Sequence, residues 1–287
     1  MPSKAEIIGQ NTMQAKLGMW AANLRDNLPE INKSRDITEL KKIKGPALCL
    51  AAGASLNLHL GEIPQFRGTI LACERNLIQL LEHGIIPDYV VSIDGDSIMA
   101  KFIDHPFVDE HMDKMTAVFA TTASPKTVNR WKGEKVFFNA WLDDINEIKS
   151  VSMVFQEITR KATCHTGGHC GATLWYLSYY LKANPIILLG IDMAYPATIT
   201  DLSHTFIWEG IKNLPREEIL SYYRRETNPF GNEVITDYVW DGYKDAWISW
   251  IKEMQESETI QCSDYTILHE PPLSVKPFKD VVQPQNI

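Results

Sequence analysis

The sequence has few cysteines, no long apolar run and no excess of positive charge, and each shortage excludes a class of protein. Five cysteines in 287 residues are too few and too scattered for a disulfide framework. No apolar run approaches the roughly 20 residues that span a bilayer, and the first residues lack the basic-then-apolar layout of a secretory signal. The sequence therefore predicts a protein of the cytoplasm without a membrane span.

The net charge of −8 argues against a broad basic surface, so nucleic acid is not an expected partner. The net charge does not exclude anionic small ligands, because a local site can be positive on an acidic protein. Hydrophobic residues make up 45% and charged residues 22% of the chain, which is typical of a folded globular protein. The length allows one large domain or two small ones with a substantial core.

From Ala47 onward, short apolar runs alternate with helical patterns. Uninterrupted apolar strands separated by helices indicate a parallel sheet that is covered on both faces, with right-handed crossovers. The predicted fold class is therefore α/β, with a Rossmann-like, doubly wound and mostly parallel sheet, whose strand order the sequence does not reveal. The predicted strands are 47–51, 69–73, 89–94, 117–121, 135–140 and 185–190.

The remaining segments are predicted to be helical additions to this sheet. Apolar residues at helical spacing predict a helix over 5–27, which Asn27-Leu28-Pro29 is expected to end. After Asp192 the pattern becomes irregular and aromatic, with helices predicted near 215–225 and 238–254. No linker precedes this part, so one compact unit is expected. Its parts are a helical N-terminal extension (1–44), a nucleotide-binding core (45–200) and a helical lid (201–287).

A turn of small residues that includes Gly53, Ala54 and Ser55 directly follows the first predicted strand. Small side chains let backbone N–H groups approach a phosphate, and the next helix adds the positive end of its dipole. Ser55 is interpreted as a helix N-cap, a phosphate ligand or both. The turn is neither a Walker A motif nor a complete G-x-G-x-x-G. A phosphate site and a tight strand-to-helix turn are thus equal alternatives.

Two carboxylates follow the third predicted strand in the run Asp94-Gly95-Asp96. Because ligands of such folds bind at the C-terminal ends of the strands, we expect this pair to face a ligand. Two carboxylates in this position can hold Mg²⁺ or Mn²⁺ against a phosphate, or bond a ribose. The alternative is structural, namely an Asx-turn and capping of the next helix by Asp96 or Ser97.

A second glycine-rich turn, Thr166-Gly167-Gly168, opens the long helix predicted over 170–182 and is flanked by two adjacent pairs of Cys and His. Adjacent ligands do not easily aim at one tetrahedral centre, so the spacing disfavours zinc. A helix N-terminus behind a glycine turn instead predicts a second anion site. Its donors would be Thr166 and the amides of Gly167 and Gly168.

Asp192 ends the last strong strand and is therefore expected at the same sheet edge as Asp94. Tyr195 and His204 follow it closely and are expected to reach into the cleft. Histidine is suited to general acid or base work near neutral pH. A lone loop histidine is usually just solvated, so this interpretation depends on the other candidates at the same edge.

Three segments, in this order, resemble the MptE-like superfamily: AAGASL, GIIPDYVVSIDGD and TGGHCGATLWYLSYYLKANPIILLGIDMAYP. That group includes the motility accessory factor glycosyltransferases and the archaeal 6-hydroxymethylpterin diphosphokinases. The resemblance covers residues 47–204 and continues through NPFGNEVITD. It implies that a nucleotide is held by the first glycine turn and the strand-end acids. The positions that match are Gly53, Ala54, Ser55, Asp94, Gly167, Gly168 and Asp192.

Two positions depart from the family pattern. The usual proline of the first turn is Ala54, and a position that is often Asn is Glu74. A carboxylate there would repel a phosphate unless it were paired, for example with the adjacent Arg75. Glu74 therefore joins Asp96, Thr166 and Tyr195 as a candidate for nucleotide binding, and the identity of the donor stays open.

The run ATTASPK stands where the diphosphokinases carry His-Ala-His-Gly-Asp, so this chain resembles the motility accessory factors more closely. Those proteins are similar to sialyltransferases that use a CMP-activated nonulosonic acid. The resemblance thus implies a transferase that moves a sugar from a nucleotide-sugar donor to a protein or small-molecule acceptor. In that reaction Asp192 or Asp94 would fix the ribose, and His204 would be the base.

Two alternatives to glycosyl transfer stay open. An ATP-dependent diphosphokinase would need Mg²⁺, for which Asp94 and Asp96 are the expected ligands. A non-catalytic nucleotide-binding protein is the other alternative. In that case Glu74 and the altered first turn would indicate that the chain has lost its activity.

Overall fold

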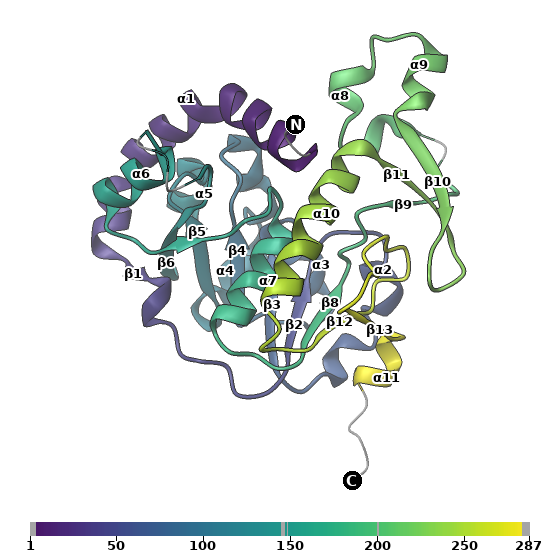
Figure 1. Cartoon of the computed structure of the whole chain (residues 1–287). Coiled ribbons are helices and arrows are strands. Elements are labelled where there is room, and N and C mark those ends of the chain that lie inside the picture. Colours follow the sequence, from purple (N-terminus) through teal and green to yellow (C-terminus); the bar gives the residue numbers. More distant parts are fainter. Residues whose placement is uncertain (1–3, 145–146, 148, 200, 283–287) are drawn as a thin grey trace.

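The computed structural model describes residues 4–144, 147, 149–199 and 201–282. Within them, parallel strands form one large sheet (Figure 1). The predicted α/β class is therefore confirmed, and every pairing in this sheet is parallel. Its strands are β1 (Arg35–Asp36), β2 (Ala47–Leu50), β3 (Thr69–Cys73), β4 (Tyr89–Ser92), β5 (Thr116–Ala120), β6 (Glu134–Ala140), β7 (Thr163–Cys164), β8 (Ile186–Leu189), β12 (Thr259–Gln261) and β13 (Ser274–Val275).

The strand order creates a switch point between β2 and β8. From β2 the sheet continues through β3, β4, β5 and β6 on one side, and through β8 and β12 on the other. Leu50, at the end of β2, lies in register with Leu189 at the end of β8. In doubly wound sheets, ligands bind in the crevice outside the carboxyl ends of two such strands. The loops after β2 and β8 therefore meet where this fold class holds its ligands.

The sheet is buried on both faces, which explains the uninterrupted apolar runs of its strands. Successive side chains of a strand point to opposite faces. Ala47 and Cys49 of β2 belong to one hydrophobic cluster, and Leu48 and Leu50 belong to another. All four side chains are fully buried. A strand of this kind needs apolar residues at every position rather than at alternate ones.

Helices and short 3-10 turns connect the strands. The α-helices are α1 (Lys4–Lys33), α2 (Leu56–His59), α3 (Leu77–Glu82), α4 (Pro106–His111), α5 (Pro125–Arg130), α6 (Val151–Thr159), α7 (Cys170–Tyr180), α8 (Trp208–Ile211), α9 (Arg216–Ser221), α10 (Tyr238–Glu253) and α11 (Phe278–Val282). The 3-10 turns are η1 (Ile37–Glu39), η2 (Ile63–Gln65), η3 (Glu74–Asn76), η4 (Ser97–Phe102), η5 (Met112–Lys114) and η6 (Leu202–His204).

The N-terminal helix α1 is longer than predicted, because it continues through Pro29 to Lys33. Two asparagines fasten it over the ends of β4 and β5: the Nδ2 group of Asn23 donates to the carbonyl of Gly95, and that of Asn27 donates to the carbonyl of Ala123. Ile31, in the part of α1 after Pro29, is fully buried and anchors the end of the helix in the core. Tertiary contacts thus outweigh the helix-breaking tendency of Pro29. Figure 1 shows α1 arching over this part of the sheet.

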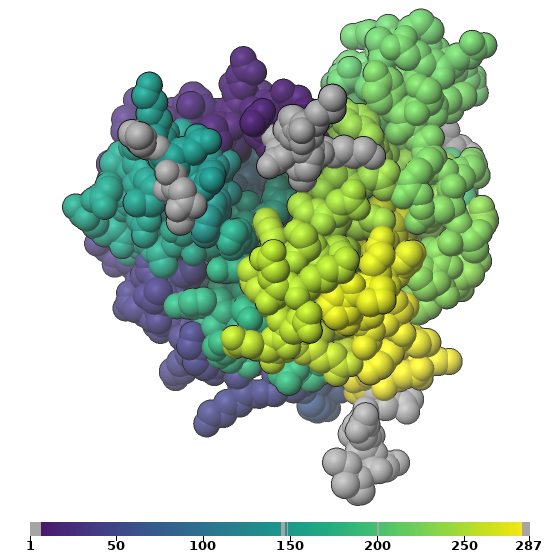
Figure 2. Space-filling model, viewed as in Figure 1, coloured from purple at the N-terminus to yellow at the C-terminus, as the bar shows by residue number. Residues whose placement is uncertain are grey.

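A small antiparallel sheet stands where a mainly helical lid was predicted. Its strands are β9 (Tyr195–Pro196), β10 (Tyr223–Thr227) and β11 (Glu233–Asp237). The predicted helix over 215–225 ends at Ser221, because Tyr223–Thr227 form β10 and pair with β11. We call residues 195–237 the arm. In Figure 1 the green arm forms a lobe beside the parallel sheet, and Figure 2 shows the same green lobe on one side of the molecule.

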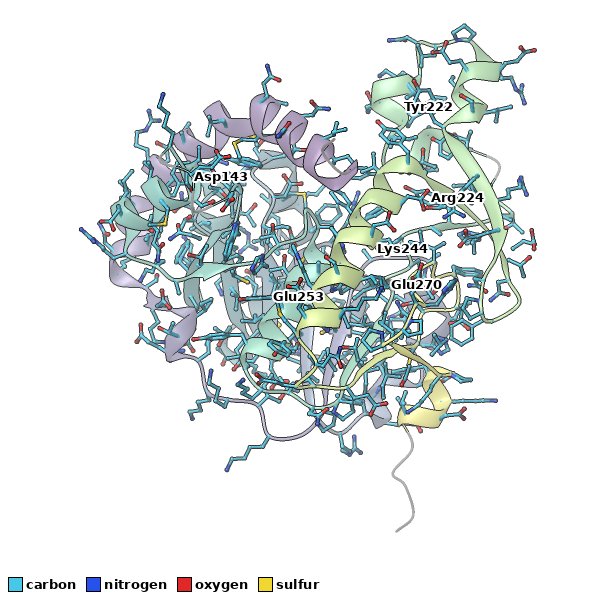
Figure 3. All side chains as sticks on the ribbon, viewed as in Figure 1. Asp143, Tyr222, Arg224, Lys244, Glu253 and Glu270 are labelled. Carbon is cyan, nitrogen blue, oxygen red and sulfur yellow. The ribbon has the colours of Figure 1, made fainter. Side chains whose placement is uncertain are left out.

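The rest of the C-terminal third packs against the core. Strands β12 and β13 come from the predicted lid segment, yet they extend the parallel sheet beyond β8. The arm meets α10 through Arg224, which bonds Asp241. Helix α10 meets the loop before β13 through Lys244, whose ammonium lies 2.6 Å from the Glu270 carboxylate; Figure 3 labels Arg224, Lys244 and Glu270. A search of the described helices finds none with the length and apolarity that crossing a membrane requires.

Candidate functional site

The first glycine turn and the strand-end Asp192 meet at the switch point. The amide of Gly53 donates to the carbonyl of Gly190 at 2.8 Å, and the amide of Ser55 donates to Oδ2 of Asp192 at 3.0 Å. A Cβ on Gly53 would lie 2.5 Å from the Gly190 oxygen and 2.6 Å from Oδ2 of Asp192. Only glycine fits this close approach. The Asp192 carboxylate thus accepts an amide of the turn whose amides were expected to bind a ligand's phosphate.

Asp192 is a buried acid with one oxygen left over. Its side chain is 2% exposed, and Oδ1 has no hydrogen-bond partner. Burial raises the pKa of this carboxyl to about 6, although the Ser55 side chain and the amides of Ser55 and Ala54 act in the opposite direction. A buried polar atom without a partner costs about 1–3 kcal/mol. At a ligand-binding edge, such an atom is a candidate for contact with a ligand.

Ser55 connects this turn to the C-terminal part of the chain. Its hydroxyl makes no cap bond to α2 but accepts the amide of Tyr265 at 2.9 Å. The neighbouring Asp264 carboxylate lies 2.6 Å from Nε2 of His59 on α2, and this bond raises the pKa of the His59 imidazole. No local pattern in the sequence predicts these contacts, because Asp264 and Tyr265 follow the three-residue strand β12, which is too short for a clear apolar run.

The hairpin of the arm is anchored to the same loop. The turn between β10 and β11 is ordered by Asn228, whose Oδ1 accepts the amides of Phe230 and Asn232. The Nδ2 groups of Asn228 and Asn232 both donate to the carbonyl of Asp264. The arm is thus fastened next to the residues that touch Ser55.

Glu74 is a second buried acid at the same edge, directly after β3. Its side chain is 3% exposed, and Oε1 accepts the hydroxyl of Ser92 at the end of β4. Burial raises its pKa to about 7, with a smaller contribution in the same direction from Asp94. Arg75 acts in the opposite direction. Glu74 is therefore poised between its charged and neutral forms near neutral pH, as acids and bases of active sites are.

Asp94 and Asp96 lie at the end of β4 and are both exposed. Oδ1 of Asp94 accepts the amide of Asp96, and Oδ1 of Asp96 accepts the amide of Ile98 and so caps η4. These are the bonds of the structural alternative, but each carboxylate keeps a second oxygen. Among the described residues no group of three or more metal-ligating side chains occurs. A metal ion at this pair would therefore have to complete its shell from water and a bound phosphate.

The second glycine turn is packed against aromatic rings. Gly167 and Gly168 have φ angles of +55° and +77°, a conformation that favours glycine. A Cβ on Gly168 would lie 2.5 Å from the ring of Tyr243, and one on Gly167 would lie 3.1 Å from Trp250. Thr166 is buried, and its carbonyl accepts the hydroxyl of Thr173. These contacts explain why glycines stand at both positions, and the anion site formed by Thr166 and the two glycine amides stays a prediction.

The histidines beside this turn serve the fold. His169 accepts the amide of Ala172 and caps α7, and burial lowers its pKa to about 4. His165 stacks on Trp141 with ring centroids 4.1 Å apart, and burial lowers its pKa as well. All five cysteines are free.

Among the bonds of the described residues, neither Tyr195 nor His204 has Asp192 or Glu74 as a partner. The Tyr195 hydroxyl accepts the amide of Phe206 at 2.7 Å and the indole N–H of Trp240 at 3.1 Å, so this tyrosine orders the arm. His204 lies on η6 with 78% of its side chain exposed, and its Nε2 is 3.5 Å from Asp201. The structure therefore brings Gly53, Ser55 and Asp192 together but places His204 on the solvent side of the arm.

Comparisons with known proteins agree with this architecture. The solved structure of the MAf glycosyltransferase from Magnetospirillum magneticum AMB-1 is similar over 90% of this chain, with 16% identity and a TM-score of 0.58. This chain spans 38% of the length of that glycosyltransferase. No curated protein matches the sequence. The family described as "6-hydroxymethylpterin diphosphokinase MptE-like" matches residues 22–198, more than half of the chain, and this protein therefore belongs to the MptE-like family.

Proposed function

We propose that this chain is a glycosyltransferase that takes its sugar from a CMP-activated donor of the sialic or nonulosonic type. Both names that the comparisons supply, a diphosphokinase and a glycosyltransferase, belong to transferases. The likeness to the MAf glycosyltransferase supports the second, since it covers 90% of this chain. The observation that carries the proposal is the unpartnered Oδ1 of Asp192 at the switch point.

Asp192 would bind the ribose of the donor. A ribose hydroxyl that donates to Oδ1 would give this oxygen the partner that it lacks, while Oδ2 keeps its bond to Ser55. The new bond would recover part of the cost of the unpaired atom. In this arrangement Gly53 leaves space for the Asp192 side chain, and the Ser55 amide holds the Asp192 carboxylate in place.

Asp192 and Glu74 both have raised pKa values, about 6 and about 7, and Glu74 is left for proton transfer if Asp192 binds the ribose. In the proposed step the acceptor oxygen gives its proton to the Glu74 carboxylate and forms a bond to the anomeric carbon. The bond from that carbon to the phosphate oxygen breaks, and CMP leaves with the electron pair. His204 stays a second candidate for the base, which would require the arm to bring it over the donor.

Diphosphoryl transfer is the second candidate, because the description of the family names it and Asp94 and Asp96 offer carboxylate oxygens at a strand end. Mg²⁺ held between these oxygens and the phosphates of ATP would supply the charge neutralisation that phosphoryl transfer needs. The exposed second oxygens of both residues fit that role.

Turnover assays separate the candidates. The purified chain is incubated with CMP-sialic acid or with ATP, each with and without Mg²⁺, and release of CMP or AMP is followed. Glycosyl transfer predicts CMP release that is lost in Asp192→Asn and kept in Asp280→Asn, which removes an exposed carboxylate on α11. Release of AMP from ATP, without release of CMP from CMP-sialic acid, would replace this proposal with diphosphoryl transfer. Nucleotide binding without turnover would favour a non-catalytic protein.

A further inference from the structure

A cavity of about 520 Å³ opens at the side of the sheet where α1 ends and β6 begins. Most of its lining residues are charged and come from the end of α1, from β1 and from the start of β6. They are Glu30, Lys33, Arg35, Lys132, Glu134 and Lys135.

This cavity is separate from the switch point. Glu134 and Lys135 are the first residues of β6, whereas Ser55 and Asp192 follow the last residues of their strands. All strands of the sheet run parallel, so the two places lie at opposite edges. A ligand in the cavity would therefore not be the donor that reacts at the switch point.

Positive charge predominates in the cavity. The ammonium groups of Lys33 and Lys135 lie 2.6 and 2.8 Å from the two oxygens of Glu30. Arg35 pairs with Glu134. Lys132 donates to the carbonyl of Asn129, which carries no charge. The cavity thus holds four cationic groups and two carboxylates, on a chain whose net charge is −8.

The floor of the cavity is fixed before any ligand arrives. The side chains of Lys135 and Glu30 are only 11% and 19% exposed. Hydrogen bonds from Lys135 and Lys33 lower the pKa of Glu30, so this carboxylate stays ionised and keeps both ammonium groups in place. Lys161 donates to the carbonyl of Ser34 at 2.6 Å and holds the backbone at the rim. Preorganised side chains reduce the entropy that binding costs.

We propose that this cavity binds a phosphorylated small molecule at a site distinct from the donor site. The planar guanidinium of Arg35 matches the geometry of phosphate oxygens, and the lysines add charge around it. Small-molecule sites have volumes of about 300–1,000 Å³, and a cavity of about 520 Å³ falls in this range. It is larger than a bare phosphate needs, so the ligand carries an organic part such as a sugar or a nucleoside.

The test titrates the ¹⁵N-labelled full chain with inorganic pyrophosphate and follows the backbone amides. The expected result is a saturable shift of amides in 33–35 and 132–135. The double variant Arg35→Gln, Lys132→Gln should bind at least about tenfold more weakly, since it loses two charge-assisted contacts. Lys182→Gln is the matched control, because Lys182 is an exposed lysine that pairs with Glu256 elsewhere. Titrations with hexose 6-phosphate and with AMP then distinguish a sugar from a nucleoside.

Three results would overturn the proposal: shifts confined to the residues after β2 and β8, equal weakening by Lys182→Gln, or shifts that grow linearly with pyrophosphate and never saturate. The unligated spectra of the variants report whether they fold, because Arg35 and Lys132 are surface residues whose replacement should leave the core resonances in place. None of these outcomes depends on whether the chain transfers a sugar.

Discussion

The turn at Gly53 and the turn at Gly167 and Gly168 both join a strand to a helix, yet different groups fill the space beside them. At Gly53 the neighbour is the carboxylate of Asp192, which can gain or lose a proton and has an oxygen without a partner. At Gly168 the neighbour is the ring of Tyr243. A carboxylate can exchange partners with a ligand, whereas a packed ring cannot.

The difference comes from residues far away in the sequence. Asp192 lies more than a hundred residues after Gly53 and reaches it because β8 pairs with β2. Tyr243 reaches Gly168 because α10 packs over the start of α7 (Figure 1). A glycine turn therefore indicates close approach, and the fold decides whether a ligand or a side chain approaches.

The largest expected effect breaks the packing at the second turn. In Gly168→Ala the new Cβ meets the Tyr243 ring at 2.5 Å and the residue keeps a φ of +77°. Left-handed backbone and overpacking together should lower the free energy of unfolding by about 3 kcal/mol. Urea denaturation measures this. Gly210→Ala is the control, since nothing lies within 4 Å of its Cβ position. Equal stability of the two variants would show that the second turn is open.

The second prediction concerns Glu74, the buried acid that directly follows β3. Glu74 has a pKa of about 7 in the folded chain against an ordinary value of 4.5. Between these pH values the folded chain binds more protons than the unfolded chain, so the free energy of unfolding falls as the pH rises. Glu74→Gln should remove this loss and stabilise the fold at pH 8 by up to about 3 kcal/mol, with no gain at pH 4.

Urea denaturation between pH 4 and 8 checks this sign. Glu82→Gln, which changes an exposed glutamate on α3, should follow the wild-type pH dependence. If Glu74→Gln and the wild type lost stability in parallel over this range, the pKa of Glu74 would not be raised in the folded chain, and its proposed part in proton transfer would lose its basis.

A smaller effect is expected where the arm is fastened near the first turn. Asn232→Ala removes one of two amide bonds to the carbonyl of Asp264 and should lower the free energy of unfolding by about 1 kcal/mol. Hydrogen exchange should quicken in residues 223–237. Gln255→Ala, which loses a bond at the exposed end of α10, should leave exchange in the arm unchanged. Unchanged exchange in Asn232→Ala would show that the arm does not depend on this anchor.

The smallest effect on stability is expected at His204. Its side chain is exposed and forms only a loose pair with Asp201, so His204→Ala should change the free energy of unfolding by less than about 0.5 kcal/mol. Turnover discriminates its role. If His204 is the base, His204→Ala should lower turnover about 100-fold or more and leave donor binding unchanged. If His204 is an uninvolved surface residue, turnover and donor binding should both stay unchanged.

The strands and the switch-point residues were accessible from the sequence because local signals specify them. Continuous apolar runs gave every strand from β2 to β6 and also β8, and strand ends marked Asp94 and Asp192. What fills each turn was not accessible, since it depends on pairing between distant strands. The same holds for the three-residue strand β12, because the loop after it places Asp264 against His59. It also holds for α1, which continues beyond Pro29 while Asn23 and Asn27 bond carbonyls of distant loops.

The most direct test of the account is the dissociation constant of CMP for the wild type, Asp192→Asn and Asp280→Asn, measured by isothermal titration calorimetry. If the free oxygen of Asp192 receives the donor ribose, Asp192→Asn should weaken CMP binding at least about tenfold, or 1.4 kcal/mol, while Asp280→Asn binds as the wild type does. Equal CMP affinity in all three proteins would contradict the assignment of the donor site to the β2–β8 switch point.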